Sequence, residues 1–162
     1  MASHKNSVSI SADSPHNKEC LALLTQLNSE LSAKYPDELR GTSLIPEDLV
    51  TAGATFLVAR REGHPVGCGA IRPFNPGVAE VKRMFVVQEE RGRGVGRAIL
   101  ENLETFAKNF GYSSIRLETG LKQPEAISLY QSAGYHRAPC YEPYRENPMS
   151  VCFEKKLDAL DS

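Results

Sequence analysis

The stretch RGRGVGR, residues 91–97, places three glycines and three arginines in seven positions. It follows a β-rich run, VAEVKRMFVV (78–87), and leads into apolar residues that recur at helical spacing from Val95 to Phe110, just before Gly111. The chain is therefore expected to change from strand to helix here, which leaves the N–H groups of the first helical turn without backbone partners. Because a helix start carries roughly half a positive charge, a phosphate group is the natural ligand.

The glycines and arginines of this stretch suit the same kind of ligand. Glycine lets the backbone approach phosphate oxygens closely, and arginine adds charge-assisted hydrogen bonds. The spacing does not fit the dinucleotide fingerprint G-x-G-x-x-G, because Arg97 stands where the third glycine should be. It does not fit the Walker P-loop either, because no lysine follows Gly96. A diphosphate site is favoured, and a flexible exposed turn with solvated arginines is the alternative.

The overall charge shows that the positive charge of residues 91–97 is local. The chain of 162 residues has 19 basic and 20 acidic side chains and a formal net charge of −1. A general nucleic-acid binder would show a broad basic excess, so nucleic acid is not expected as a partner. The length predicts a single domain over residues 1–162.

The four cysteines, Cys20, Cys68, Cys140 and Cys152, are widely spaced and include no Cys-x-x-Cys pair. Neither a zinc site nor a thioredoxin-like motif is predicted, and no metal is expected. The sequence contains no run of about 18 apolar residues and no hydrophobic region of signal-peptide type. A cytoplasmic location with reduced thiols, and no membrane partner, is therefore expected.

The remaining periodicity predicts alternating strands and helices. We expect a strand at 7–11, a helix at 15–34 with Ser14 as its cap, and a loop at 35–49 with a short helix near Pro46. These are followed by a hairpin at 55–74, a strand at 78–87, a helix at 95–110, a strand at 113–119, a helix at 123–134, and closing strands at 135–141 and 149–157. The order β-α-α-β-β-β-α-β-α-β-β predicts an α/β (α+β) domain with a mixed sheet flanked by helices.

Several motifs in register resemble the GNAT superfamily of acetyl-CoA-dependent N-acetyltransferases. The family signature [Q/R]-x-x-G-x-[G/A] at a strand-to-helix junction is met by Arg91, Gly94 and Gly96. The preceding AEVKRMFVV resembles the central strand of the family, and LETG with EAISLYQSAGY resembles the next strand and the helix after it. The element order fits the family fold from about residue 7 to 157, so the resemblance covers nearly the whole chain.

The resemblance implies that acetyl-CoA is the co-substrate, and it gives each matching residue a role. The pyrophosphate would be held by backbone N–H groups of Arg91, Gly92, Arg93, Gly94, Val95, Gly96 and Arg97. The pantetheine arm would pair with the backbone of Met84, Phe85 and Val86, and the Met84 N–H would polarise the thioester carbonyl. Gln123 stands where the family usually has asparagine, although glutamine can make similar hydrogen bonds. The family is also compatible with a homodimer.

Acetyl transfer to an amine needs a base, because an alkyl ammonium with a pKa near 10 is mostly blocked at neutral pH. By resemblance, Glu80, eleven positions before Arg91, is the candidate base. Met84 lies four strand residues further on, about 13 Å at roughly 3.3 Å per residue, so the proton would travel through water. The alternative is that Glu80 is a partly exposed strand residue paired with Lys82 or Arg83.

The departing thiolate needs an acid, and by resemblance this is Tyr130. The alternative is a tyrosine whose ring only packs. His64, in a hairpin turn, and His136, in a closing strand, are expected to be structural or solvated. An acetyl-cysteine intermediate on Cys140 would need a nearby base, and the sequence shows none. Direct attack by the amine in a ternary complex is therefore favoured.

Two loops, 35–41 and 140–148, are candidates for binding the acceptor. Their charged and aromatic side chains are Asp37, Glu38 and Glu142, which could attract an ammonium, Arg40 and Arg145, which could hold a carboxylate, and Tyr141 and Tyr144. Each could equally be a solvated loop charge or a packing residue. The sequence predicts an N-acetyltransferase that acts on a primary amine of a small metabolite, an amino-acid-like compound or a protein. The rival hypothesis is a non-catalytic module that senses acetyl-CoA.

Overall fold

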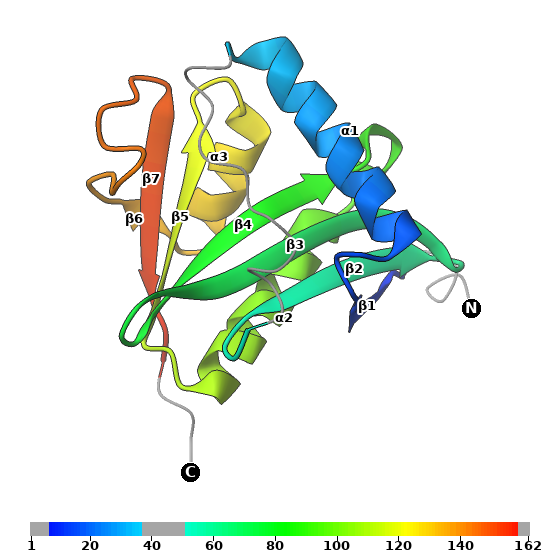
Figure 1. Cartoon of the computed structure of the whole chain (residues 1–162), viewed down its shortest axis with the longest axis horizontal. Coiled ribbons are helices and arrows are strands. Elements are labelled where there is room, and N and C mark those ends of the chain that lie inside the picture. Colours follow the sequence, from blue (N-terminus) through cyan, green and yellow to red (C-terminus); the bar gives the residue numbers. More distant parts are fainter. Residues whose placement is uncertain (1–6, 37–50, 159–162) are drawn as a thin grey trace.

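A computed structural model describes residues 7–36 and 51–158. Seven strands in this part of the chain form one sheet in the order β1-β2-β3-β4-β5-β7-β6 (Figure 1). The strands are β1 (Ser9–Ala12), β2 (Thr55–Arg61), β3 (His64–Asn75), β4 (Val78–Val86), β5 (Ser114–Gly120), β6 (His136–Arg137) and β7 (Ser150–Lys156). The β4–β5 pair is parallel and the other pairs are antiparallel, which confirms the predicted mixed sheet.

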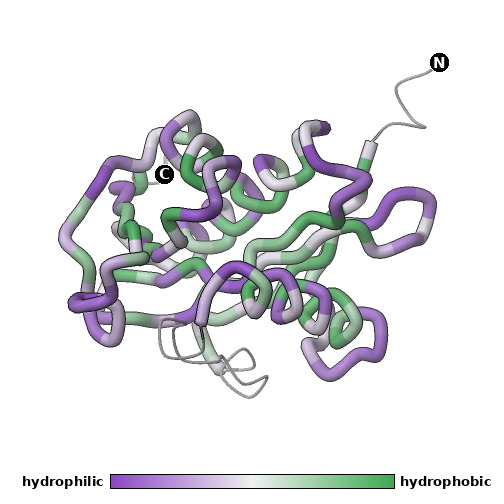
Figure 2. Tube along the Cα trace, turned by 90° about the horizontal axis from the view of Figure 1, so that it is seen from above, coloured by the Kyte–Doolittle hydropathy of each residue, from purple (hydrophilic) through white to green (hydrophobic). Residues whose placement is uncertain are grey.

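Helices cover both faces of this sheet. They are α1 (Lys18–Lys34), α2 (Val95–Phe110) and α3 (Pro124–Ser132), with a short 3-10 turn, η4 (Gln88–Glu90), before α2. Along the tube of Figure 2, hydrophobic residues gather on the strands, while several of the connecting loops are hydrophilic. None of these described helices is both long enough and apolar enough to span a membrane.

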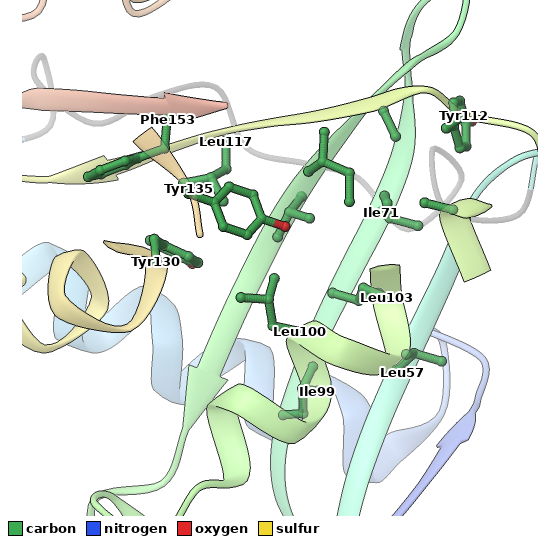
Figure 3. Close-up of a cluster of buried hydrophobic side chains, with 14 of the residues drawn as sticks. Leu57, Ile71, Ile99, Leu100, Leu103, Tyr112, Leu117, Tyr130, Tyr135 and Phe153 are labelled. Carbon is green, nitrogen blue, oxygen red and sulfur yellow. The ribbon is translucent and has the colours of Figure 1, made fainter. Parts of the chain in front are cut away.

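Two apolar layers hold the helices on the sheet. On one face, Cys20, Leu23 and Leu27 of α1 pack on buried residues of β2, β3 and β4. On the other face, α2 contributes Ile99, Leu100 and Leu103 to a larger core that reaches Tyr130, Tyr135 and Phe153 (Figure 3). The α2 helix ends at Gly111, which has a φ of 108° and donates its N–H to the carbonyls of Ala107 and Lys108. This confirms Gly111 as the terminating residue.

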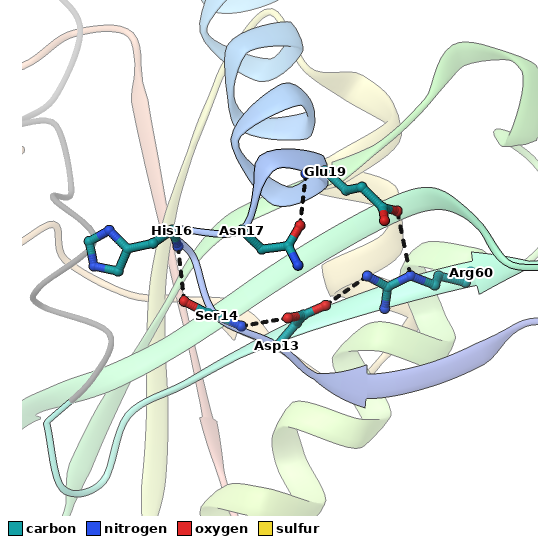
Figure 4. Close-up of polar contacts among 6 residues, drawn as sticks. All are labelled: Asp13, Ser14, His16, Asn17, Glu19 and Arg60. Atoms are coloured by element: carbon teal, nitrogen blue, oxygen red, sulfur yellow. Dashed lines mark hydrogen bonds and ion pairs between the residues drawn. The ribbon is translucent and has the colours of Figure 1, made fainter.

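The start of α1 differs from the prediction. Asn17, not Ser14, is the N-cap, because the Asn17 side chain accepts a hydrogen bond of 2.8 Å from the Glu19 N–H (Figure 4). Ser14 lies in the turn before the helix, where its hydroxyl accepts a hydrogen bond of 3.2 Å from the His16 N–H. Asp13 bonds the guanidinium of Arg60 on β2 at 2.7 Å and so ties the segment before α1 to the sheet.

Three further predictions concern the first closing strand, the cysteines and a short helix. The first closing strand, predicted at 135–141, is only the two residues of β6, because Pro139 has no N–H to continue the ladder. The expected reduced thiols are wrong for one pair: Cys140 and Cys152 form a disulfide, with Cα atoms 5.1 Å apart. Cys20 and Cys68 are free and buried. The short helix expected near Pro46 lies outside the described residues.

Candidate active site

The site begins where β4 and β5 stop pairing. Their parallel ladder joins Val78–Val81 to Ser114–Leu117 and goes no further. Figure 1 shows the two strands diverging beyond this point, with β5 continuing toward α3. Among the described strands, none pairs with the edge of β4 that faces β5 from Lys82 onward. An unpaired strand edge offers N–H and C=O groups to an extended ligand.

A bulge in β4 accompanies this divergence. Cys68 pairs with Phe85 and Ala70 pairs with Lys82, so Arg83 and Met84 together oppose the single residue Gly69. Arg83 has a φ of 61°, unusual for a residue with a side chain, and its guanidinium donates to the Asn28 side chain on α1 at 3.1 Å. A Cβ on Gly69 would lie 2.6 Å from the Met84 sulfur and 2.7 Å from Cγ2 of Ile99, so a larger residue here would force these side chains to shift.

The diverging strands open a cleft of about 1450 Å³. This exceeds the range of about 300–1,000 Å³ typical of small-ligand pockets. Its walls come from the Glu80–Val86 part of β4, the Glu90–Arg97 loop and helix start, Glu118 and Thr119 of β5, the Gln123–Ser132 part of α3, the Leu27–Lys34 part of α1, and Tyr144. The cleft is thus lined by both predicted catalytic residues and by all of the predicted cofactor residues except Arg93.

At one end of the cleft, the glycine–arginine loop opens into α2. Gly94 is the N-cap, with a φ of 83° and no side-chain cap. The first intrahelical bond runs from the Ala98 N–H to the Gly94 carbonyl, so the N–H groups of Val95, Gly96 and Arg97 have no intrahelical acceptor. A Cβ built on Gly92 or Gly94 meets no atom within 4 Å, which means that the loop faces open space. This end of the cleft can accept an anion on backbone donors alone.

The three arginines of the loop do not act alike. Arg91 points into the protein: it donates to the Val86 carbonyl at 2.8 Å and pairs with Glu30 of α1 at 2.5 Å. Arg91 therefore ties α1 to the loop rather than adding charge for a ligand, contrary to the expected role of its guanidinium. Arg97 bonds the neutral hydroxyl of Ser132, so its charge stays uncompensated there. Arg93 is mostly exposed and lies 3.8 Å from Glu90.

Tyr130 lies on α3 and lines the cleft. Its ring packs between Tyr135 and Phe153, with centroids at 5.9 and 6.1 Å (Figure 3). Only 4% of the residue is exposed, yet its hydroxyl makes no hydrogen bond with any residue that the structure describes. Burial, with a contribution from Glu118, raises the pKa of Tyr130 far above its usual value, so it stays protonated. A buried hydroxyl without a partner is costly, which points to a ligand atom as its partner.

Glu80 is deeply buried and has two partners. One carboxylate oxygen lies 3.0 Å from the Arg72 guanidinium and the other accepts a bond of 2.8 Å from the Tyr141 hydroxyl. The partners named in the sequence-based alternative, Lys82 and Arg83, are therefore wrong, and so is its partial exposure. Glu80 links the sheet to the loop after β6. Its role as base stays a prediction.

Gln123 is the N-cap residue of α3, but its side chain turns back to the end of β5. It accepts from the Gly120 N–H at 3.2 Å and approaches the Thr119 hydroxyl at 3.5 Å. Tyr35 packs against the same turn, where its hydroxyl accepts from the Lys122 N–H at 3.0 Å. Gln123 thus shapes the turn that leads into α3 and lines the cleft. Contact with a cofactor arm stays a prediction.

A pair of charges lies at the fork, the point beyond Val81 and Leu117 where β4 and β5 separate, and it was not predicted from the sequence. If the β4–β5 ladder continued by one residue, Lys82 would lie opposite Glu118. Both residues line the cleft, and they influence each other electrostatically without forming an ion pair. The sequence carries no signal for this pair, because the register that aligns residues 36 positions apart comes only from the sheet.

The candidate acceptor loops are partly described. In residues 140–148, Tyr141 and Tyr144 are buried, whereas Glu142 and Arg145 form an exposed ion pair of 3.5 Å. Cys140 is held in its disulfide and is not a free thiol. Asp37, Glu38 and Arg40 lie outside the described residues. His64 and His136 are exposed and do not line the cleft, as expected for residues without a catalytic role.

This geometry agrees with what known proteins show. Residues 20–135 match the acetyltransferase (GNAT) family, which is most of the chain. The protein belongs to the GNAT family.

Similar proteins span nearly the whole length of this GNAT chain. IAA acetyltransferase of Azospirillum brasilense is 39% identical over 151 residues, which are 93% of this chain and 98% of that protein. A structure from Klebsiella pneumoniae, assigned as an acyl-CoA N-acyltransferase, is 32% identical with a TM-score of 0.80, and the match covers 94% and 99% of the two chains. A GNAT acetyltransferase of Elizabethkingia anophelis with acetyl-CoA bound shares the fold at 20% identity, with a TM-score of 0.67 over 93% and 98%.

Membership of the GNAT family makes this protein an acyltransferase and accounts for the arrangement of the cleft. The glycine–arginine loop, the open edge of β4 and Tyr130 all face one continuous space. Within residues 7–36 and 51–158, no three His, Cys, Asp or Glu side chains gather as metal ligands.

The environment of Glu118 leads to a prediction about stability. Burial raises the pKa of this carboxyl above its ordinary 4.5, although Ser150 donates a bond of 2.7 Å to it and Lys82 lowers the pKa. Between the unfolded and the folded pKa, the folded state binds more protons, so the free energy of unfolding falls as pH rises through this window. The Glu118→Gln variant has no titrating group at this position, so it does not lose this stability as the pH rises. Its stability relative to the natural protein should grow as the pH is raised from about 4.5 to 8.

Urea unfolding at several pH values measures this difference. Glu101→Gln is the matched control, because Glu101 is exposed on α2 and its side chain is remote from the cleft. The control should change stability by less than about 0.5 kcal/mol at every pH. A difference in stability between Glu118→Gln and the natural protein that stays constant from pH 4.5 to 8 would contradict the raised pKa of Glu118.

Proposed function

We propose that this protein transfers the acetyl group of acetyl-CoA to a primary amine, by direct attack in a ternary complex. The observation that carries the proposal is the cleft itself, which combines donors for a diphosphate, an open strand edge and a buried hydroxyl without a partner. Each of these three features leaves polar groups unsatisfied, and acetyl-CoA would satisfy all three. The acetyl-CoA bound to the Elizabethkingia relative supports this choice of donor.

Each part of acetyl-CoA has matching residues. The backbone from Gly92 to Arg97 would hold the pyrophosphate, with Arg97 adding charge. The β4 edge from Met84 to Val86 would pair with the pantetheine arm, and the Met84 N–H would polarise the acetyl carbonyl. When bound, acetyl-CoA supplies an activated acetyl group. The protein supplies orientation, a base and a hydrogen-bond donor.

Tyr130 would assist the departing sulfur mainly by donating a hydrogen bond. Its raised pKa keeps the hydroxyl protonated at neutral pH. A free thiol has a pKa near 8.5, so full proton transfer from Tyr130 to a thiolate would be uphill. A hydrogen bond to the sulfur still becomes stronger as negative charge develops there. This interaction favours the transition state over the ground state, as catalysis requires.

Two carboxylates are candidates for the base. Both oxygens of Glu80 are engaged, by Arg72 and by Tyr141. Glu118 is held on one oxygen by Ser150, lines the cleft, and has a raised pKa, which makes it a better proton acceptor near neutral pH. We therefore favour Glu118 as the base, and Glu80 is the alternative.

The first experiment tests the donor site. Gly94→Glu places a carboxylate where the pyrophosphate would bind, and the affinity for acetyl-CoA measured by calorimetry should fall at least tenfold, or about 1.4 kcal/mol. Gly63→Glu is the matched control: Gly63 has a φ of 82°, against 83° for Gly94, and both face open space. The backbone strain is then similar in the two variants. Equal affinities in both would exclude this loop as the diphosphate site.

The second experiment tests Tyr130. Tyr130→Phe should lower kcat about a hundredfold without weakening acetyl-CoA binding. It should not destabilise the fold, because the hydroxyl has no hydrogen bond to lose. Tyr135→Phe is the control and should lower stability while leaving kcat unchanged. The Tyr135 hydroxyl donates a hydrogen bond of 2.8 Å to Glu104, and Tyr135 does not line the cleft. An unchanged kcat in Tyr130→Phe would leave Tyr130 as a packing residue.

The third experiment separates the two carboxylates by the pH dependence of the rate. Loss of the base should slow the reaction most at low pH, and less as the pH approaches the pKa of the amine, near 10. We expect this pattern for Glu118→Gln, and a loss that is nearly constant with pH for Glu80→Gln, because Glu80 anchors the loop that carries Tyr141. The reverse result would identify Glu80 as the base.

Thiol release from acetyl-CoA over a panel of amines distinguishes an enzyme from the rival module. Binding of acetyl-CoA without thiol release for any amine would favour a sensor.

A further inference from the structure

The fork between β4 and β5 holds two opposite charges that do not pair with each other. Lys82 is the first residue of β4 beyond the ladder, and Glu118 is its counterpart on β5. Both side chains line the same cleft. No ion pair within 4.0 Å joins Lys82 to any carboxylate in the described part of the chain. The fork therefore presents one positive and one negative group to whatever enters.

Lys82 has hydrogen-bonding capacity to spare. Its ammonium donates to the Tyr144 hydroxyl at 2.6 Å and lies 5.3 Å from the centre of the Tyr144 ring. An ammonium has three donors, and only this one is used among the described residues. Because Tyr144 accepts this bond, its own hydroxyl proton is available to the same ligand. Burial and the nearby Arg72 and Arg83 lower the pKa of Lys82, which means that its charged form is disfavoured. An anionic ligand would stabilise this charged form.

The other charges around the fork are already engaged. Glu80 is paired with Arg72 and bonded to Tyr141, and Arg83 donates to Asn28. Glu118 accepts from the neutral Ser150 hydroxyl. Among the charged groups at the fork, those left to bind an incoming molecule are therefore Lys82, beside Tyr144, and Glu118.

We propose that the acceptor is a small molecule that carries a carboxylate close to its amine, as an α-amino acid does. Lys82 and Tyr144 bind the carboxylate, and Glu118 receives the amine. This inference rests on the proposed function and names its substrate class. Met84, whose N–H is assigned to the acetyl carbonyl, follows Lys82 by two residues, about 7 Å or less along a strand. The lysine side chain and a carboxylate one carbon from the amine together cover the distance between the Lys82 backbone and an acetyl carbonyl held at the Met84 N–H.

These groups account for every proton and every bond in the acetyl transfer. The acceptor ammonium loses one proton to Glu118, and the freed nitrogen attacks the acetyl carbon. The C–N bond forms and the C–S bond breaks. A second proton leaves the nitrogen and ends on the thiolate, while the proton on Glu118 passes to solvent. The products are the N-acetyl acid and coenzyme A with a free thiol.

Matched acceptors test the proposal in the full-length protein. The panel contains the common α-amino acids, the corresponding α-carboxamides and the corresponding decarboxylated amines, each assayed by thiol release from acetyl-CoA. For at least one side chain, kcat/KM should be at least tenfold higher for the acid than for the amide and the amine, because a bond to a charged group contributes about 1.5–3 kcal/mol.

Variants of Lys82 assign this preference to the fork. Lys82→Met should reduce kcat/KM for the acid at least tenfold more than for the amide, and should leave the KM for acetyl-CoA unchanged. Lys82→Arg keeps the charge and should restore most of the preference. Lys156→Met is the control for the loss of one positive charge, because Lys156 is exposed on β7 and does not line the cleft.

The outcomes separate this inference from the function on which it rests. Thiol release with amines or amides that is as fast as with the acids, or an equal loss for acid and amide in Lys82→Met, would overturn the amino-acid acceptor while leaving the acetyltransferase intact. Thiol release with no amine at all would overturn the proposed function and the inference together.

Discussion

The site depends on the point at which β4 and β5 stop pairing. Four residues of each strand are joined, and the apolar residues Ala79, Val81, Ile115 and Leu117 bury this paired half in the core. Beyond it, backbone groups of β4 lose their partners, and such groups need water or a ligand. The core thus holds the two strands together at one end, so that they can separate at the other. The bulge at Arg83 and Met84 turns β4 at this position.

Three segments from distant parts of the chain are tied around the open half. Glu30 of α1 pairs with Arg91, so the helix over one face is connected to the glycine–arginine loop. A Cβ on Gly96 would lie 3.2 Å from Leu129, which shows how closely the start of α2 approaches α3. The loop after β6 is held by Tyr141 on Glu80, by Tyr144 on Lys82 and by the disulfide to β7. Side chains, rather than the sheet ladder, therefore shape the cleft.

The sequence predicted those features that arise from local patterns. The strand-to-helix junction at residues 91–97, the α2 helix and its end at Gly111 each follow from a few neighbouring residues, and so does the mixed sheet from the order of elements. The partners of Glu80 could not be predicted, because Arg72 becomes its neighbour through hairpin register and Tyr141 lies 61 residues away. The Cys140–Cys152 bond and the Lys82–Glu118 fork depend in the same way on which strands adjoin. Spacing along the chain carries little of this information.

The fork also shows how a fold can hold charge ready for a ligand. Continued pairing of β4 and β5 would bring Lys82 and Glu118 face to face, and each would lower the electrostatic cost of the other. Their separation leaves both partly desolvated, with the pKa of the lysine lowered and the pKa of the glutamate raised. The protein thereby loses stability at the part of the cleft that presents both a positive and a negative group. A ligand that carries both charges would restore the electrostatic stabilisation that is lost where the strands separate. Only a ligand whose charges are spaced to match Lys82 and Glu118 could do so.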